Sequence, residues 1–373
     1  MSGEIVAQRV RQLIARRGQS QGEFAALAGL DPSKMSKSLS GTRRFTSLDL
    51  ARIAELGGVT VDWLLGADDA PALAARVSSP PGTSAETAAH VADRLTQLRA
   101  DLAFLGYEQR SALPSSPPTG SWWVGQGQRL AAWARDRART SGADPSHTRD
   151  LADLIESVFG IDVAINKLPA GFDGLACSKQ HARLILAGTS TVPSRQRFTL
   201  AHELGHVLAE DDQGLLLDTD IYDKHHSKQC SEVRANAFAT AFLLPEELLR
   251  SETSGMAWTD DAFAKLVFRW WVSPSALAWR LHNLDLIPKE LCDSFRRMTT
   301  EMAALLAGEL GSFTEWIDVA SRRRVPQLLL RDTFQAYLDG ASTLRPFASL
   351  IGVNSETIRQ ALEQAREEPP LTS

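Results

Sequence analysis

One ten-residue segment limits what this chain can fold into more than any other, because it places two histidines at helical spacing. Residues 197–206 read Arg-Phe-Thr-Leu-Ala-His-Glu-Leu-Gly-His, which contains the pattern His-Glu-x-x-His. Residues four apart lie on one face of a helix, so His202 and His206 can bind a single metal ion together. Glu203 lies beside them, where it can serve as a general base. The segment therefore predicts a helix that forms the centre of a zinc-dependent hydrolase site.

The overall composition is that of an ordinary globular protein, and 373 residues leave room for more than one domain. The formal net charge of -5 does not by itself indicate a nucleic-acid-binding protein, so any basic surface must be local. Cys177, Cys230 and Cys292 lie far apart, which favours a reducing compartment over a disulfide framework. The sequence shows no evident signal peptide and no apolar run approaching about 18 residues. We therefore expect a cytoplasmic protein that does not cross a membrane.

Residues 4–66 carry the signals of five short helices. Ser20 is placed to cap a helix over residues 21–28, and Asp31 followed by Pro32 is placed to begin the next one. A first helix is expected where Val6, Val10, Leu13 and Ile14 recur at helical spacing before Gly18, and further helices are expected over 48–56 and 61–65. Two short helices joined by a tight turn, the second with exposed polar residues, are typical of a helix-turn-helix.

This N-terminal segment resembles the XRE (Cro/C1-type) family of helix-turn-helix domains. The resemblance rests on residues 21–30, 33–37 and 60–66, and it implies binding to a double-stranded DNA operator. By the resemblance, the residues facing base edges are Ser33, Lys34, Ser36 and Lys37, and those near phosphates are Gln21, Arg43 and Arg44. Nine lysines and arginines stand against six acidic residues between positions 4 and 66, so the local charge is positive, as phosphate binding requires. The alternative is a repressor-like fold that serves only protein–protein contacts.

Two Pro- and Ser-rich stretches, 78–84 and 114–120, have the composition of linkers. Between them apolar residues alternate spacings of four and three, at Val91, Leu95, Leu98, Leu102 and Leu105. This pattern predicts a helix with one apolar seam. The seam either packs on a neighbouring domain or forms a homodimer contact of the kind that helix-turn-helix proteins use to span two half-sites.

A lone His-Glu-x-x-His is weak evidence, so the third ligand decides the interpretation. Short apolar runs over 161–165 and 183–187 predict strands before the motif helix, which should run from Pro193 or Ser194 to about 209. A catalytic zinc has three protein ligands and an open position. Glu232, which lies 26 residues after His206 on a second expected helix, is the best third candidate. Asn236 follows one turn later, where it can orient a metal ligand through a hydrogen bond.

Other residues compete for these roles. The segment before Glu232 is expected to be a loop, and it contains the alternative ligands Asp223, His225, His226 and Cys230. A solvated acidic loop is expected for Asp211, Asp212, Asp218, Asp220 and Asp223. The oxyanion of the reaction also needs a stabilising group, and the sequence does not rank the candidates His181, Tyr222, His225 and His226.

Residues 147–288 are similar to the ImmA/IrrE family of metallopeptidases. The similarity rests on the 197–206 segment, on Glu232 followed by Ala-Asn-Ala-Phe-Ala at 235–239, and on Leu-Leu-Pro at 243–245. It implies that His202, His206 and Glu232 hold Zn²⁺ and that Glu203 polarises the attacking water. Arg234 departs from the pattern, since many relatives carry a second acidic residue there. This position is not a ligand, so the departure concerns the surroundings of the metal or a substrate contact.

These observations predict a mainly α (α+β) protein. We expect a five-helix DNA-binding domain at 1–70, a linker with an amphipathic helix at 71–120, a zincin-like metallopeptidase domain with a small sheet at 121–290, and a helical C-terminal region with a helix-turn-helix-like segment at 291–373.

The leading hypothesis is a DNA-binding transcriptional regulator with zinc-dependent endopeptidase activity. Its protein substrate would be a repressor or an antitoxin-like partner, in a stress, mobile-element or defence response. One rival is a transcription factor whose metal site is sensory or structural, without peptidase activity. A second rival is the antitoxin of a toxin–antitoxin pair.

Overall fold

The computed structural model describes residues 2–17, 19–57, 64, 74–77, 84–116, 118–120, 122–168, 172–179, 181–211 and 221–367. The chain divides into two compact units, Met1–Pro71 and Ala72–Ser373. It is mostly helical with one small sheet, in agreement with the mainly α prediction. Within the described residues, no helix is both long and apolar enough to cross a membrane.

The first unit consists of short helices with strong local start signals. They are α1 (Ser2–Arg16), α2 (Gln21–Leu27), α3 (Pro32–Leu39) and α4 (Ser47–Gly57). The side chain of Ser20 caps α2 in a reciprocal arrangement with Glu23, and Asp31 accepts hydrogen bonds from two backbone N–H groups at the start of α3. The fifth expected helix, 61–65, lies outside the described residues apart from Leu64, which is buried. The two predicted N-caps are thus confirmed, and both fix where a helix begins.

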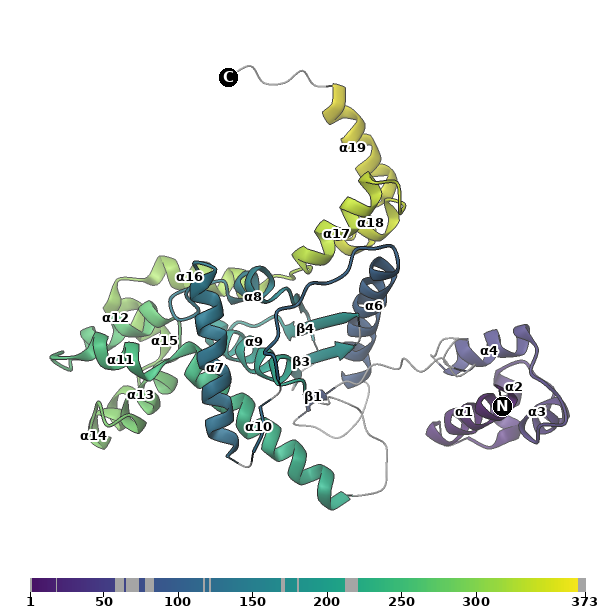
Figure 1. Cartoon of the computed structure of the whole chain (residues 1–373), viewed down its shortest axis with the longest axis horizontal. Coiled ribbons are helices and arrows are strands. Elements are labelled where there is room, and N and C mark those ends of the chain that lie inside the picture. The colour runs from purple at the N-terminus through teal and green to yellow at the C-terminus, as the bar shows by residue number, and fades with distance from the viewer. Residues whose placement is uncertain are drawn as a thin grey trace. The chain divides into compact units, whose positions relative to one another are not determined.

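The second unit places many helices around a sheet (Figure 1). Around the sheet these are α6 (Ser84–Phe104), α7 (Trp123–Thr140), α8 (Leu151–Phe159), α9 (Pro193–Leu208) and α10 (Ile221–Leu243). The strands are β1 (Ala74–Val77), β2 (Asp162–Asn166), β3 (Phe172–Lys179) and β4 (Ala182–Gly188). The later helices are α11 (Glu246–Thr253), α12 (Asp260–Trp270), α13 (Pro274–Asn283), α14 (Lys289–Phe295), α15 (Thr300–Ala307), α16 (Leu310–Ser321), α17 (Gln327–Leu338), α18 (Arg345–Ile351) and α19 (Ser355–Glu367).

The strands pair in the order β1-β3-β4-β2, with β2 parallel to β4 and the other pairs antiparallel. The runs expected to be strands at 161–165 and 183–187 correspond to β2 and β4. Strand β3 was not expected from the sequence, and it forms a hairpin with β4. Its interior contains glycine, cysteine and serine, so its local β-propensity is low and the pairing with β4 stabilises it.

Both faces of the sheet are covered. Alternate side chains point to opposite faces of a strand, and here they enter two different cores. Ile185 and Ala187 pack with α8, α9 and α10, whereas Leu184 and Leu186 pack with α6 and α17. Because both faces are buried, the strands appear in the sequence as nearly continuous apolar runs.

Helix α6 covers the face of the sheet opposite to α9. Leu95 and Leu102 of its apolar seam are buried in the core shared with β3 and β4, as the packing interpretation expects. Leu105, at the end of the seam, is 41% exposed. The seam therefore contributes to the second unit itself.

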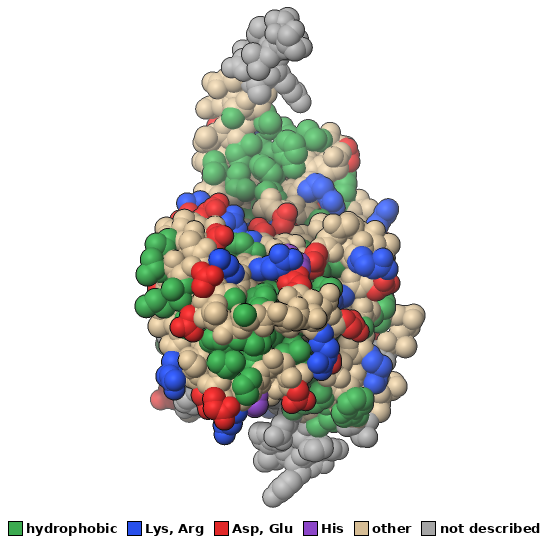
Figure 2. All heavy atoms as spheres, turned by 90° about the vertical axis from the view of Figure 1, so that its left-hand side faces the viewer, with side chains coloured by type: hydrophobic (Ala, Val, Ile, Leu, Met, Phe, Trp, Pro, Cys, Tyr) green, Lys and Arg blue, Asp and Glu red, His purple; other side chains and the backbone are tan. Residues whose placement is uncertain are grey.

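The C-terminal helices α17, α18 and α19 follow one another with few buried residues. Apolar side chains that remain exposed there include Leu338, Ile351 and Val353. Figure 2 shows apolar side chains gathered towards this end of the chain, and charges of both signs mixed over the remainder of that face. One apolar core extends from Leu130 to Trp316, across the boundary expected after residue 290. The domain boundaries expected within this unit therefore stay predictions.

Candidate metal centre

Helix α9 carries the His-Glu-x-x-His pattern through the middle of the second unit. It begins with Pro193 in its first turn and ends at Leu208, close to the expected bounds. Gly205 allows α10 to approach, since a Cβ at this position would lie 2.9 Å from Cδ1 of Phe238. The close packing of α9 and α10 brings the second helix beside the two histidines.

Three of the predicted ligands meet at one point. The Nε2 atoms of His202 and His206 lie 3.0 Å apart, and both side chains are buried. The two carboxylate oxygens of Glu232, from α10, lie 3.4 Å from Nε2 of His202 and 3.5 Å from Nε2 of His206. One ligand atom from each residue falls within a cluster 4.8 Å across. This is the His₂Glu donor set of a catalytic zinc site.

The contacts of Nδ1 in each imidazole ring show whether Nε2 of the same ring has a lone pair available to a metal. Nδ1 of His202 lies 3.1 Å from the side-chain oxygen of Asn236, and Nδ1 of His206 lies 2.8 Å from a carboxylate oxygen of Asp211. Oxygens of these kinds accept hydrogen bonds, so both Nδ1 atoms donate and both Nε2 atoms carry lone pairs. Two lone pairs facing each other at this separation repel unless a cation lies between them. The residues therefore fit a metal ion.

The carboxylate of Glu232 is held in its charged form. Burial alone would raise its pKa, but the imidazoles of His202 and His206, when protonated, lower the pKa well below the usual range of a glutamate through hydrogen bonds and charge. An anionic third ligand is what a divalent cation at this site needs.

Glu203 lies next to His202 on α9 and is only 2% exposed. Strand β3 runs close to it, because a Cβ at Gly174 would lie 2.7 Å from Cγ2 of Thr199 and 3.5 Å from Cγ of Glu203. Only a glycine lets the strand approach the helix in this way. The carboxyl of Glu203, the candidate base, is thus buried on α9 close to β3, a strand that the sequence did not predict.

The sequence interpretation misplaced one residue and one segment near the cluster. Asp211 was expected in a solvated acidic loop, but its side chain is only 12% exposed and contacts both His206 and Arg234. The segment preceding Glu232 was expected to be a loop, but residues 221–231 form the first turns of α10. The only signal for Asp211 was its place directly after the motif helix, five residues beyond His206.

The competing ligands and the candidates for stabilising the oxyanion divide into two groups. Cys230 is buried on α10, and His181 is exposed after β3. The side chains of Tyr222, Asp223, His225 and His226, and the expected acidic residues Asp212, Asp218 and Asp220, lie outside the described residues. The choice of an oxyanion-stabilising group therefore stays open.

The predicted DNA contacts all belong to the first unit. Gln21 begins α2, and Ser33, Lys34, Ser36 and Lys37 are exposed on α3. Arg44 is also exposed. Arg43 differs, since its guanidinium pairs with Asp49 at 2.9 Å and donates to Ser38 Oγ at 3.0 Å.

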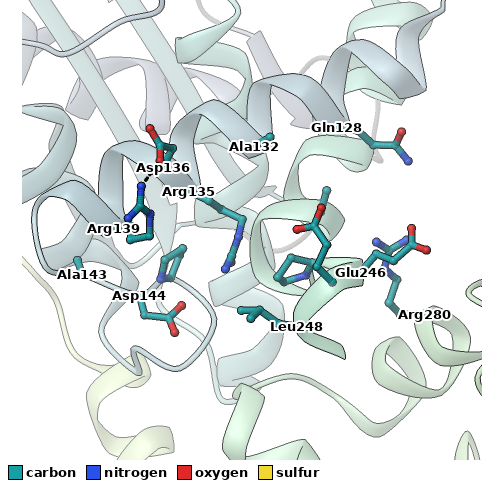
Figure 3. Close-up of a pocket in the computed structure, with 14 residues that line it drawn as sticks. Gln128, Ala132, Arg135, Asp136, Arg139, Ala143, Asp144, Glu246, Leu248 and Arg280 are labelled. Atoms are coloured by element: carbon teal, nitrogen blue, oxygen red, sulfur yellow. Dashed lines mark hydrogen bonds and ion pairs between the residues drawn. The ribbon is translucent and has the colours of Figure 1, made fainter. Parts of the chain in front are cut away.

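A cavity of about 620 Å³ lies elsewhere in the second unit, and none of its lining residues belongs to the metal cluster. Figure 3 shows Arg135 of α7 and Arg280 of α13 among its walls. Arg135 donates to the carbonyl of Phe242 and Arg280 to that of Leu244. These guanidinium groups therefore satisfy carbonyls at the end of α10, as basic side chains commonly do at helix C-termini.

Comparison with known proteins agrees with this geometry. Residues 156–282 match the model of the IrrE N-terminal-like domain. The radiation response metalloprotease IrrE of Deinococcus radiodurans is 34% identical over 141 residues, which cover 38% of this chain and 42% of that protein. The protein of the same name from Deinococcus deserti is 32% identical over 169 residues, which cover 45% of this chain and 57% of the relative.

The chain thus spans about half the length of these relatives. The matched stretch contains all three candidate ligands, and a metallopeptidase domain implies a bound metal, typically zinc. Residues 156–282 are therefore similar to the IrrE N-terminal-like domain, and this similarity supports a metallopeptidase domain in the second unit.

Proposed function

We propose that the chain is a DNA-binding transcriptional regulator that is also a zinc-dependent endopeptidase. The observation that carries the enzymatic part is the meeting of His202, His206 and Glu232 beside the buried carboxyl of Glu203. A purely structural zinc site usually has four protein ligands and needs no base, whereas among the described residues this cluster has three ligands with a carboxylate next to them. The three cysteines are free and buried, which supports a reducing cytoplasm as its location.

The chain's own residues divide the chemistry between them. Zinc held by His202, His206 and Glu232 would polarise the peptide carbonyl and make the attacking water more acidic. Glu203 accepts a proton from that water and returns it to the leaving nitrogen of the peptide. Asn236 orients the ring of His202 through its Nδ1 atom. The products are a free carboxylate and a free amine.

DNA binding is proposed from the first unit. The two short helices α2 and α3 are separated by a turn in which Gly29 has φ 64°, and the second helix exposes Lys34 and Lys37. This arrangement supports major-groove contacts from α3. A homodimer would present two such helices to an operator with two half-sites.

The proposed substrate is a regulatory protein, either a repressor or an antitoxin-like partner. The name of these relatives connects them with a radiation response, and for this chain we propose a stress, mobile-element or defence response. A protease and a DNA-binding unit on one chain can couple a signal to the removal of a repressor.

The proposal is tested by comparing new protein N-termini in cells that express the wild type or Glu203→Gln. Glu203→Gln should retain zinc, because it leaves the three ligands in place, and it should abolish the new termini. One or a few termini found only with the wild type would identify the substrate. The matched control is Glu301→Gln, which changes an exposed carboxylate on α15.

Three results would each contradict a part of this proposal. Equal cleavage by purified wild type and Glu203→Gln would remove Glu203 from the mechanism. An unchanged set of termini, with zinc bound to both and operator affinity dependent on zinc, would instead indicate a transcription factor with a sensory or structural metal. Suppression of a toxin encoded by a neighbouring gene, with no cleavage, would indicate an antitoxin.

A further inference from the structure

Arg234 is buried two residues after the ligand Glu232, on the same helix α10. The rest of its surroundings come from α7 and from the end of α9. One terminal nitrogen of its guanidinium donates to a carboxylate oxygen of Asp211, and the other donates to Oε1 of Gln126 at 3.1 Å. The guanidinium also lies over the ring of Trp123, 5.4 Å from its centroid. A charged group this buried needs such partners.

The carboxylate of Asp211 connects this arginine to the metal cluster. Its other oxygen accepts the hydrogen bond from Nδ1 of His206, at 2.8 Å. The orientation of the imidazole is therefore set by a carboxylate that the guanidinium itself holds. A carboxylate behind a ligating histidine fixes the ring and makes the coordinating nitrogen a stronger donor.

Helix α7 packs closely against α10 beside Arg234. A Cβ at Gly127 would lie 2.3 Å from the carbonyl oxygen of Arg234, so the two backbones touch there. Gln126 in turn donates to the carbonyl of Gly120 at 2.6 Å. The contacts of Arg234 thus extend from His206 to the segment that leads into α7.

We propose that Arg234 is a positioning residue of the metal centre, which holds Asp211 against His206 and anchors that pair to the first turns of α7. The inference rests on the proposed binding of zinc and deepens it. Arg234 acts through Asp211, so its effect on the metal exists only while that carboxylate is present. The planar guanidinium suits the role because its separate nitrogens reach two acceptors at fixed angles.

The test measures the dissociation constant of zinc by competition with a chromophoric chelator, for the full-length wild type and its variants. Asp211→Asn should weaken zinc binding about 10–100-fold, which is the usual effect of losing a carboxylate that orients a ligating histidine. Arg234→Gln should weaken it about tenfold, and Arg234→Lys by less, because an ammonium restores the charge without the second contact. In the Asp211→Asn background, Arg234→Gln should have no further effect.

A second readout separates positioning from general stability. The visible spectrum of the Co²⁺-substituted protein should change in Arg234→Gln and in Asp211→Asn, because the geometry around His206 changes. The matched control is Arg135→Gln, which removes a partly buried arginine of the cavity wall (Figure 3). Arg135 also contacts α10, through the carbonyl of Phe242. This variant should lower the melting temperature of the metal-free protein and leave zinc affinity and the Co²⁺ spectrum unchanged.

The outcomes distinguish this inference from the proposed function. A wild type that binds neither zinc nor cobalt overturns both. A wild type that binds zinc tightly while Arg234→Gln binds it equally well overturns the role of Arg234 alone. Additive losses in the double variant also overturn it, since they mean that Arg234 does not act through Asp211. Where Arg234→Gln does not fold, Arg234→Lys and Gln126→Leu carry the same comparison.

Discussion

The imidazole rings of His202 and His206 turn their Nε2 atoms towards each other because the opposite side of each ring is already bound. Asn236 holds one ring and Asp211 holds the other. The positions of both histidines follow from spacing within one helix, and the sequence predicts them. The partner Asp211 lies outside the helix, and its contact with His206 depends on how the chain leaves α9.

At the residue scale, we expect Glu232→Gln to weaken zinc binding by more than about a hundredfold. The substitution removes the anionic ligand and keeps its size, so the loss reports the carboxylate's direct role. Isothermal titration of the metal-free protein measures the effect. Glu247→Gln, on the exposed start of α11, is the control and should bind zinc as the wild type does. Tight binding by Glu232→Gln would require a different third ligand.

At the scale of the elements, α6 is held in the fold both by apolar packing and by a buried ion pair. Its apolar residues face the sheet, and Arg99, 1% exposed, lies among them. The guanidinium pairs with both oxygens of Asp162 at the start of β2, at 2.7 and 2.8 Å, and with Asp332 of α17 at 2.6 Å. A single buried cation therefore joins a helix, a strand and a later helix.

We expect Arg99→Met to destabilise the protein by about 3–5 kcal/mol at neutral pH, since it leaves the buried carboxylate of Asp162 without its cationic partner. Burial raises the pKa of Asp162 above its usual value even with Arg99 present. A carboxyl with a raised pKa in the folded state favours folding more as the pH falls. The deficit should therefore be smaller below neutral pH than at neutral pH, because Asp162 then becomes protonated. Urea denaturation measures it.

The control for this experiment is Arg94→Met on the exposed side of α6, which should change stability by no more than about 0.5 kcal/mol. A deficit in Arg99→Met that is equally large at neutral pH and below it would show that lost packing, and not the unpaired carboxylate, accounts for it.

Elements themselves differed in how well the sequence predicted them. Helices α2 and α3 begin at the expected caps, because capping depends on residues within one turn. Strand β3 was missed, since its stability comes from pairing with β4. The early turns of α10 were expected to be a loop because residues 223–230 are mostly polar and show no apolar period. They form helix without any glycine or proline to interrupt it.

At the scale of the whole molecule, the chain holds two compact units with separate candidate sites. The predicted DNA contacts belong to one and the metal cluster belongs to the other. A substitution at the candidate site of one unit therefore changes none of the residues proposed for the activity of the other unit.

For DNA, we expect Arg44→Ala, at an exposed position predicted to lie near phosphates, to weaken binding of the full-length chain to a short random duplex. The dependence of log affinity on log salt should become shallower by about one, since one phosphate contact is lost. Zinc content should not change. Fluorescence anisotropy at several salt concentrations measures the effect, with Lys289→Ala of α14 as the control. A wild type without measurable DNA affinity would favour protein–protein contacts for the first unit.

The sequence by itself determined what lies within one or two turns of chain: the paired histidines, the neighbouring base, and the helix starts at Ser20 and Asp31. Spacing along a helix is set by backbone geometry, which needs no further information. The sequence also named Glu232 as the best third ligand, but only the tertiary structure decided that it meets the two histidines, that Asp211 orients His206, and that Arg234 holds the carboxylate of Asp211. Those contacts depend on how α7, α9 and α10 pack against one another. Such packing is set by the fit between side chains that are far apart in the sequence, which local sequence patterns do not describe.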